Sequence, residues 1–351
     1  QPTPFMRHEY LTALHESGSA TPRTGWTPRF LSLWQGDVLW AACPLYVKSH
    51  SYGEYVFDWA WANAYAEHGL PYYPKAVVAV PFTPVPGTRL MARDCETRAA
   101  LVQALRDWCT QAGVSSLHLL FADDTDMDAC KAAGLMQRQT VQFHWKNVAP
   151  TLGTTVSSLP PEGALAALGR PGSGSMAPTL GTGVSSLPPE GALAALGRPG
   201  GGSVAYRDFD DFLSCLSQEK RKKIRQERRR VADAGVRFEW RQGTDIASSD
   251  WDFFYRCYER TYLEHGNPPY LTRDFFRRMA AHMPEAWLLF IAERNGQQIA
   301  SSLIAISAYP SSVTGQKYSE FVAYGRYWGA LERVDCLHFE ACYYQPLQWC
   351  I

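Results

Sequence analysis

The stretch that decides the fold is Tyr324-Gly325-Arg326-Tyr327-Trp328-Gly329, followed by Leu337-His338-Phe339-Glu340-Ala341-Cys342-Tyr343-Tyr344. The first segment is aromatic and predicts a short strand, and the second predicts the start of a helix. A strand that leads into a helix N-terminus is a common place for an anionic cofactor, because the first N–H groups of the helix lack partners within it. The sequence ends at Ile351, so we expect this element to be unfinished and the chain to be truncated at its C-terminus.

Composition indicates two ordinary domains. The 351 residues are 46% hydrophobic and 19% charged, and 34 basic residues balance 34 acidic ones. This neutrality gives no overall field that favours nucleic acid or a membrane. The nine cysteines form no C-x-x-C pair and no long apolar run occurs, so we expect reduced thiols in a cytoplasmic protein without a membrane-spanning segment. No spacing fits a metal site, a phosphate-binding loop or a nucleophile elbow.

A repeat divides the chain. Residues 149–175 recur as 177–203, with Gly183 and Gly201 in place of Thr155 and Ser173. Each copy predicts one short helix, Ala164–Leu168 in the first, but two copies are too few for a stacked solenoid. The Gly/Ser-rich ends favour a flexible linker. We interpret residues 149–205 as a functionally inert linker, with a docking element as the alternative.

The two halves outside the repeat show a similar order of predicted elements. In residues 1–148 the patterns predict helices at His8–Glu16, Thr97–Ala112 and Asp126–Ala133, and strands at Phe30–Trp34, Val38–Val47, Ala76–Phe82, Ser116–Ala122 and Thr140–Trp145. The turn around Gly36 predicts a hairpin of the first two strands, and Leu101, Leu105, Trp108 and Cys109 predict one apolar face of the helix at Thr97–Ala112. In residues 206–351 they predict helices at Trp251–Leu263, Thr272–His282 and Leu337–Tyr344, and strands at Trp287–Glu293, Gln298–Ile306 and Phe321–Trp328. Asn295-Gly296 predicts a hairpin of the first two strands. We therefore expect a mixed α/β (α+β) fold with two domains, 1–148 and 206–351, related by duplication.

Four blocks of sequence carry a resemblance to a known family. They are Phe57-Asp58-Trp59-Ala60-Trp61-Ala62, Pro71–Lys75 with Ala79–Arg89, Tyr206–Leu213 with the basic helix that follows, and Tyr324–Tyr344. In these blocks the chain resembles the FemAB-like family of predicted bacterial N-acyltransferases, named for peptidoglycan biosynthesis or recognition. The family has no counterpart of the insert Ala149–Ala205 and continues past the position of Ile351.

The resemblance implies a fold and an activity. The implied fold is two GNAT-like acyl-CoA N-acyltransferase domains in tandem. The implied reaction moves an acyl or aminoacyl group to an amine, with a peptidoglycan precursor as the expected acceptor. Acyl-CoA or aminoacyl-tRNA would then serve as co-substrate, and no tightly bound cofactor or metal is expected.

Two elements are candidates for holding the donor. The turn Gly87-Thr88-Arg89 follows a strand that ends in Pro and Gly, which frees backbone N–H groups, and Arg89 adds a guanidinium for phosphate or carboxylate. The alternative is a rigid turn between two elements. In the second half, Arg326 beside Tyr327 and Trp328 is the corresponding candidate clamp for an anion, and the alternative is core packing.

Three residues are candidate proton carriers. His338 or Glu340 could accept a proton from the attacking amine. Side chains two positions apart on a helix point about 200° away from each other, so at most one of the two faces a cleft. The alternative places His338 as a satisfied polar neighbour of a core. Asp58 lies in sequence among Trp59, Tyr72, Tyr73 and Lys75. We expect it either to act as a base with a raised pKa or to pair with Lys75.

Aromatic faces such as those around Asp58 suit a substrate made of sugars and peptides. We predict that these aromatic residues and Lys75 bind such a substrate. The alternative is that Asp58 caps a loop and the tryptophans fill a core.

A basic helix is the local exception to neutrality. Residues 218–230 contain eight basic and two acidic residues. Arg221, Lys222 and Arg225 are predicted to contact RNA phosphate, since such a helix attracts a polyanion. The alternative is a solvated face balanced by acids at positions 208, 210 and 211.

Three classes of function therefore remain open. The first is an N-acyltransferase, the second is a non-catalytic module that recognises cell-wall glycopeptide, and the third is an RNA-binding protein. Only the basic helix favours the third.

Overall fold

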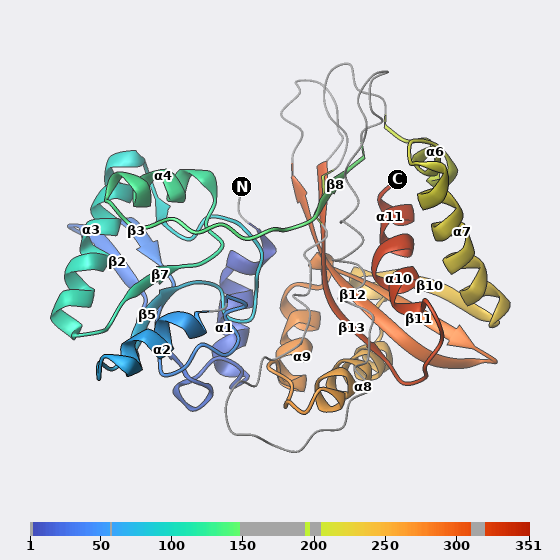
Figure 1. The fold of residues 1–351 in the computed structure, drawn as a ribbon, viewed down its shortest axis with the longest axis horizontal. Helices are drawn as coiled ribbons and strands as arrows, with labels where there is room; N and C mark the ends of the chain where they lie inside the picture. Colours follow the sequence, from blue (N-terminus) through green and yellow to red (C-terminus); the bar gives the residue numbers. More distant parts are fainter. Residues whose placement is uncertain (1–2, 57, 148–193, 197–204, 310–319) are drawn as a thin grey trace. The chain divides into compact units, whose positions relative to one another are not determined.

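The computed structural model describes residues 3–56, 58–147, 194–196, 205–309 and 320–351. They form a mixed α/β protein of two compact units (Figure 1). Unit 1 comprises Gln1–Thr140 and Tyr270–Met283, and unit 2 comprises Val141–Pro269 and Pro284–Ile351. The repeat and its predicted helix Ala164–Leu168 lie outside the described residues, apart from the short strand at 194–196.

The described part of unit 1 contains two small sheets. The four-stranded sheet has the order β1 (Trp26–Pro28), β4 (Leu45–Lys48), β5 (Lys75–Val78) and β7 (Leu117–Leu119). The three-stranded sheet has the order β2 (Leu31–Gln35), β3 (Val38–Cys43) and β6 (Met91–Ala92). Strand β5 pairs with β7 in parallel and with β4 antiparallel. The predicted hairpin around Gly36 is confirmed by the antiparallel pairing of β2 and β3.

Helix α3 (Cys95–Ala112) connects the parallel strands β5 and β7 and shows why this segment is helical. The side chain of Asp94 accepts from the backbone N of Thr97 at 2.7 Å, which caps the first turn. Gly113 ends the helix at φ +61°, a conformation that suits glycine. The predicted apolar face is confirmed, since Leu101 and Leu105 are buried in the core of unit 1.

Helix α9 (Arg273–His282) belongs to unit 1 although the chain reaches it from the second half. Helix α1 (His8–Glu16) buries Tyr10 and Leu14, and the ring of Tyr10 meets Phe275 edge-on at 5.3 Å. An ion pair between Arg278 and Glu16 joins the same two helices. The remaining helices of unit 1 are η1 (Pro4–Met6), η2 (Pro22–Thr24), α2 (Trp59–Glu67) and α4 (Asp124–Ala132).

Unit 2 is built around one six-stranded sheet. Its order is β10 (Val236–Gln242), β11 (Trp287–Arg294), β12 (Gln297–Tyr309), β13 (Glu320–Ala330), β9 (Ala194–Leu196) and β8 (His144–Lys146). The strands pair antiparallel except β8 with β9. Asn295 and Gly296 both have positive φ and confirm the predicted hairpin between β11 and β12. Strand β8 overlaps the strand predicted at Thr140–Trp145, and it pairs here in the sheet of unit 2.

The helices of unit 2 pack against this sheet. They are α6 (Phe209–Ser214), α7 (Gln218–Asp233), η3 (Gly243–Asp245), α8 (Ser248–Glu264), η4 (Pro284–Ala286), α10 (Leu337–Phe339), the π-helical turn η5 (Glu340–Tyr344) and α11 (Gln345–Cys350). Helix α8 approaches β13 so closely that a Cβ on Gly329 would lie 1.9 Å from the carbonyl O of Cys257. Glycine is therefore required at that position.

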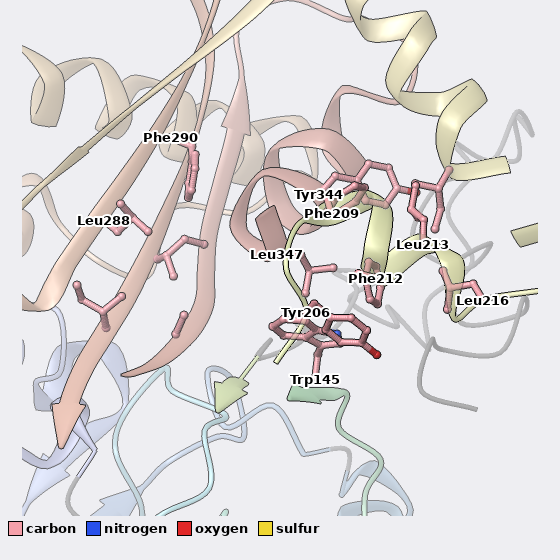
Figure 2. Close-up of a cluster of buried hydrophobic side chains, with 14 residues drawn as sticks. Trp145, Tyr206, Phe209, Phe212, Leu213, Leu216, Leu288, Phe290, Tyr344 and Leu347 are labelled. Carbon is pink, nitrogen blue, oxygen red and sulfur yellow. The ribbon is translucent and has the colours of Figure 1, made fainter. Parts of the chain in front are cut away.

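A core of aromatic and aliphatic side chains holds α6, α11 and the sheet together (Figure 2). Trp145 of β8 stacks on Tyr206 at 6.0 Å, and Phe212 meets both rings edge-on. Leu288 and Phe290 come from β11, and Tyr344 and Leu347 come from the last helical segment. This core holds in place the segment after β13 that was predicted to decide the fold, Leu337–Tyr344.

No helix in the described ranges is long and apolar enough to cross a membrane. Nor do the described histidines, cysteines and carboxylates gather into a group that could hold a metal ion.

Candidate functional site

Two lysines face each other across strands β4 and β5 in unit 1. Lys48 is the register partner of Lys75, and both side chains are 0% exposed. Lys48 Nζ donates to the carbonyl O of Tyr52 at 3.1 Å and lies 3.7 Å from the ring centroid of Trp26. Like charges opposite each other destabilise a sheet, and buried charges cost several kcal/mol each unless they are compensated. The lysine pair therefore requires acids close by.

The loop between β4 and α2 supplies these acids. Lys75 Nζ donates to Glu54 Oε2 at 2.8 Å and to Ser51 Oγ at 2.8 Å, and it forms an ion pair with Asp58. Glu54 and Asp58 are themselves buried. We call Lys48, Lys75, Glu54 and Asp58 the buried ionic cluster. Asp58 pairs with Lys75, as one of the two sequence-based alternatives expected.

A chain of hydrogen bonds leads from the buried ionic cluster to half-buried groups. Tyr72 OH donates to Asp58 Oδ2 at 2.7 Å and lies 3.3 Å from His118 Nε2. The same imidazole nitrogen lies 2.9 Å from Ser116 Oγ. His118 and Ser116 are only half-buried. This polar chain of Asp58, Tyr72, His118 and Ser116 can carry a proton between the interior and the surface of unit 1.

The pKa values in the cluster are displaced from their usual ranges. Burial lowers the pKa of Lys48 to about 7, although the Glu54 carboxylate opposes this. Burial raises the pKa of Glu54 against the pull of Lys75. Burial also favours a raised pKa for Asp58, but hydrogen bonds from Lys75 and Tyr72 outweigh it and hold that pKa below its usual value. The expectation of a raised pKa at Asp58 is therefore wrong, and Glu54 is the carboxylate whose pKa moves upward.

Unsatisfied atoms and backbone strain accompany the cluster. Glu54 Oε1 and Asp58 Oδ1 are buried and have no hydrogen-bond partner in the described part of the chain. Tyr55 lies between these two acids in sequence and has φ +58°, and Phe82 also has φ +58°. Non-glycine residues in this region of φ cost about 1–3 kcal/mol and often occur at functional sites. These features are typical of a site that is organised for chemistry.

Exposed aromatic side chains lie beside the acidic loop. Trp59 is 38% exposed and Trp61 is 40% exposed, both on α2, and Tyr52 is 50% exposed. The rings of Tyr52 and Trp59 meet edge-on at 5.9 Å. Tyr73 OH lies 2.8 Å from Ser51 Oγ, so its ring connects this surface with the cluster. The structure thus brings together Trp59, Tyr73 and Asp58, as the sequence predicted, and it leaves the indoles accessible.

The turn at Gly87-Thr88-Arg89 is tightly bonded within unit 1. The Arg89 side chain is buried and donates to the carbonyl oxygens of Leu120 at 3.1 Å, Gly87 at 3.1 Å and Val85 at 2.5 Å. Thr88 Oγ1 donates to a carboxylate oxygen of Asp123, the N-cap residue of α4, at 2.5 Å. These bonds give Arg89 a structural role. Its contact with a donor stays a prediction.

Strand β13 has a bulge at Arg326. Tyr327 lies opposite Leu303 and Gly325 lies opposite Ile304, so Arg326 is one extra residue in the strand. Arg326 and Tyr327 are buried, and the guanidinium carbon lies 5.1 Å from the centroid of the Tyr327 ring. Two predicted site residues therefore lie together at a kink in the strand.

His338 follows β13 in an aromatic environment. Its ring lies 5.5 Å from that of Trp328 and 5.8 Å from that of Tyr343. Burial lowers the pKa of His338 to about 4, so the imidazole is neutral near pH 7. A catalytic role for His338 stays a prediction.

Glu340 is 4% exposed and accepts three hydrogen bonds from two side chains. Arg228 Nε donates to both carboxylate oxygens at 3.1 and 3.2 Å, and Gln345 Nε2 donates to Oε1 at 2.7 Å. Arg228 comes from the basic helix α7, which sequence reasoning connected with RNA and not with Glu340. The structure therefore joins two predicted features that the sequence treated separately.

The basic helix α7 is partly anchored to unit 2. Arg221 donates to the carbonyl oxygens of Ser214 at 3.1 Å and Leu216 at 2.5 Å, and Arg225 forms an ion pair with Asp210 at 3.0 Å. Lys222 is exposed. The alternative of a partly balanced, solvated face is thus supported at Arg225 and Asp210.

Sequence reasoning missed Lys48, Glu54, Ser51 and His118. They lie 4 to 60 positions from Asp58, in an irregular loop or on strands that look apolar, so no short motif connects them. One signal was present: strands β4 and β5 each have a lysine at one end of an otherwise apolar segment, Leu45–Lys48 and Lys75–Val78. A cation at the end of a buried strand requires a partner, and the acidic loop that follows β4 supplies it.

The comparison with protein families gives an independent result. The FemAB-like family, described as peptidoglycan biosynthesis/recognition, matches residues 1–150 and 203–351. The match stops at the repeat and resumes after it, as expected for an insert that the family lacks. No curated protein matches the chain. The two matched segments cover most of the sequence, and the chain therefore belongs to the FemAB-like family.

Proposed function

We propose that this chain is an N-acyltransferase that moves an acyl or aminoacyl group to an amine of a peptidoglycan precursor, in the cytoplasm, with two GNAT-like units in tandem. Membership of the FemAB-like family supports the connection with peptidoglycan. A parallel β5–α3–β7 connection in unit 1 and a bulged strand that leads into a helical segment in unit 2 are compatible with the proposed fold.

The buried ionic cluster is the observation that carries this proposal. A core of apolar residues is usually as stable as a buried set of ion pairs or more so, so four buried charges indicate a purpose beyond stability. The lowered pKa of Lys48, about 7, and the raised pKa of Glu54 place two proton acceptors closer to neutral pH. Groups with such displaced pKa values are suited to acid–base catalysis.

The proposed reaction needs no covalent enzyme intermediate. The acceptor ammonium loses a proton to the cluster through Ser116, His118 and Tyr72, and the amine nitrogen attacks the acyl carbonyl carbon. A C–N bond forms, and the C–S bond of an acyl-CoA or the C–O ester bond of an aminoacyl-tRNA breaks. The nitrogen gives up a second proton as the amide forms, the leaving sulfur or oxygen takes up one proton, and the proton held by the cluster returns to water, so the step releases one proton overall.

The other predicted residues have distinct proposed roles. Trp59, Tyr72 and Tyr73 contact the acceptor, and Asp58 passes the proton along the polar chain. Arg326, with Tyr327 and Trp328, contacts the donor. Because Arg228 and Gln345 hold Glu340, we assign Glu340 a positioning role rather than proton transfer.

A transfer assay tests the proposal. Labelled acetyl-CoA and labelled aminoacyl-tRNA are each mixed with the chain and a peptidoglycan precursor peptide that carries a free lysine amine. Glu54→Gln should slow transfer by about 100-fold or more, because a general base contributes that much. Glu67→Gln, at the exposed end of α2, is the matched control and should retain the rate.

Two results would overturn this function. One is the absence of transfer with both donors, and the other is equal rates for Glu54→Gln and Glu67→Gln. Circular dichroism spectra of both variants establish whether a lost rate reflects lost structure.

Recognition of glycopeptide without reaction is the second candidate function. The exposed rings of Tyr52, Trp59 and Trp61 favour it, since aromatic faces suit sugars. Binding of a cell-wall glycopeptide that Trp59→Ala weakens, with no turnover by either donor, would support recognition over transfer.

A further inference from the structure

An open hollow of about 340 Å³ lies on unit 2 between the C-terminal half of α7, strand β10 and the π-helical turn. Its polar lining includes Arg228, Arg229, Glu340 and Gln345, and its apolar lining includes Val236 and Phe238. The hollow thus combines two guanidinium groups with an apolar wall. The proposed function uses Glu340 of this lining only as a positioning residue held by Arg228 and Gln345, and it assigns no ligand to the hollow.

Arg228 is fixed in the hollow before any ligand arrives. Its Nε bonds both oxygens of Glu340, and its Nη2 donates to Gln348 Oε1 at 2.8 Å. The guanidinium carbon also lies 4.5 Å from the centroid of the Phe209 ring. A side chain held in this way loses little conformational freedom on binding, which favours affinity.

The π-helical turn explains how Glu340 and Gln345 reach the same place. Pro346 lacks an N–H and crowds the carbonyl four residues before it, so the helix widens to a π turn at Glu340–Tyr344. In a wider turn, residues five apart lie one above the other, and Gln345 Nε2 bonds Glu340 Oε1 at 2.7 Å. Such turns cost stability and often mark functional sites.

The charged side chains around the hollow leave an excess of positive charge. Glu340 is neutralised by Arg228 at 3.0 Å. Arg229 is exposed and makes no ion pair with any residue that the structure describes. The hollow therefore offers one positioned and one uncompensated guanidinium, a pair that suits the oxygens of a phosphate. Phe238 is half-buried and offers a surface for a flat, weakly polar ring, whereas Val236 is buried.

We propose that this hollow binds the phosphate of a nucleotide, with Arg229 as the main contact, Arg228 as the positioned partner and the apolar wall against the base. We assign this phosphate to the donor, because acyl-CoA and aminoacyl-tRNA both carry nucleotide phosphates. This assignment rests on the proposed function. A small nucleotide and an RNA share this chemistry, and the experiment separates them.

Isothermal titration of the full chain provides the test, with adenosine 3′,5′-bisphosphate as the small probe and a generic RNA hairpin as the large one. Arg229→Gln should weaken binding of the effective probe by about tenfold or more, the loss expected for one charge-assisted contact. Arg237→Gln is the matched control, because Arg237 lies on β10 between Val236 and Phe238 and so points to the other face of the strand. Its affinity should remain that of the unmodified chain.

A third variant identifies the source of the phosphate. The third variant is Arg225→Gln. Arg225 lies one helical turn before Arg229 on α7 and does not line the hollow. This variant should weaken the RNA as well if RNA lies along the helix, with a steep dependence on salt, and leave the small nucleotide unaffected. Either pattern supports the hollow, provided that Arg229→Gln has a larger effect than Arg237→Gln.

Two results overturn the proposal. One is no binding of either probe at millimolar concentration, and the other is equal weakening by Arg229→Gln and Arg237→Gln, which indicates general charge attraction. The titration needs no turnover, so it is independent of the transfer assay. Loss of transfer activity with intact nucleotide binding would count against the proposed function alone.

Discussion

The buried ionic cluster of unit 1 and the basic helix of unit 2 treat positive charge in opposite ways. Lys48 and Lys75 are fully buried within an apolar sheet, and two carboxylates compensate them. Helix α7 instead carries its eight basic residues at positions 218–230 mostly on a solvated surface. Charges interact more strongly where water is excluded. Two isolated lysines therefore tell more about chemistry than the most basic segment of the sequence.

Arg228 stands between these extremes. Its side chain is 26% exposed, yet its partner Glu340 is almost fully buried. Mutations that remove one cation from each environment should therefore produce graded effects.

Lys75→Met should have the largest effect. Without Nζ, Glu54 and Asp58 become buried carboxylates that lack their main cation, and breaking a buried pair in this way costs about 3–5 kcal/mol. Urea unfolding measures the loss. Lys222→Met on the exposed face of α7 is the matched control, with an expected change within about 0.5 kcal/mol. Equal unfolding midpoints for the two variants would contradict the comparison.

Arg228→Met should have an intermediate effect. It removes both bonds from Nε to Glu340, but Gln345 still donates to that carboxylate. We expect a loss of about 1–3 kcal/mol, as for a buried polar group that loses a charged partner. Arg229→Met, at the next position, should leave the unfolding midpoint nearly unchanged. The idea of graded burial would fail if Arg228→Met were as harmful as Lys75→Met.

Acid should destabilise both units through their histidines. Burial lowers the pKa of His118 to about 4, and also that of His338 to about 4, against about 6.5 in an unfolded chain. The unfolded chain therefore binds these protons first, so the stabilisation is complete above about pH 6.5 and is lost as the pH falls towards 4. Each histidine should contribute on the order of 1–3 kcal/mol over this window. Thermal midpoints between pH 4 and 7 should vary less for His118→Asn than for the unmodified chain, and an identical slope would rule out His118 as a source.

Deletion of residues 151–202 should have the smallest effect. The described residues that flank this segment lie close together, because Asn147 Oδ1 accepts from the backbone N of Tyr206 at 3.0 Å. The deletion removes the three-residue strand β9, but it also shortens the connection between β8 and α6, which lowers the entropy cost of bringing its ends together. We expect a change in unfolding free energy within about 1 kcal/mol. A loss of several kcal/mol would show that β9 is an essential strand of the sheet.

Local patterns predicted much of the fold. The bounds of α1 and the buried face of α3 followed from helical periodicity, and the β11–β12 hairpin followed from Asn295-Gly296. Helix α2 (Trp59–Glu67) was not predicted, because its alanines alternate with larger residues and so hide the helical period, although alanine itself favours a helix. Strand β10 (Val236–Gln242) was also missed, although its alternation of apolar and charged residues was a usable signal.

The candidate site was harder to predict because its contacts are distant in sequence. The aromatic neighbourhood of Asp58 was visible, and so was its pairing with Lys75. Glu54 and His118 join that pair only because β4, β5 and β7 are neighbours in one sheet. The pairing of Arg228 with Glu340 spans 112 positions. No local pattern could have revealed it.

The way the chain is shared between the units has a practical consequence. Unit 1 takes α9 from the segment that follows the repeat, and unit 2 takes β8 from the segment that precedes it. Each half of the gene product therefore holds a part that the other unit needs. Separate expression of the halves should give two incomplete fragments, whereas their co-expression should restore both units, which makes the repeat a natural split point for a complementation reporter.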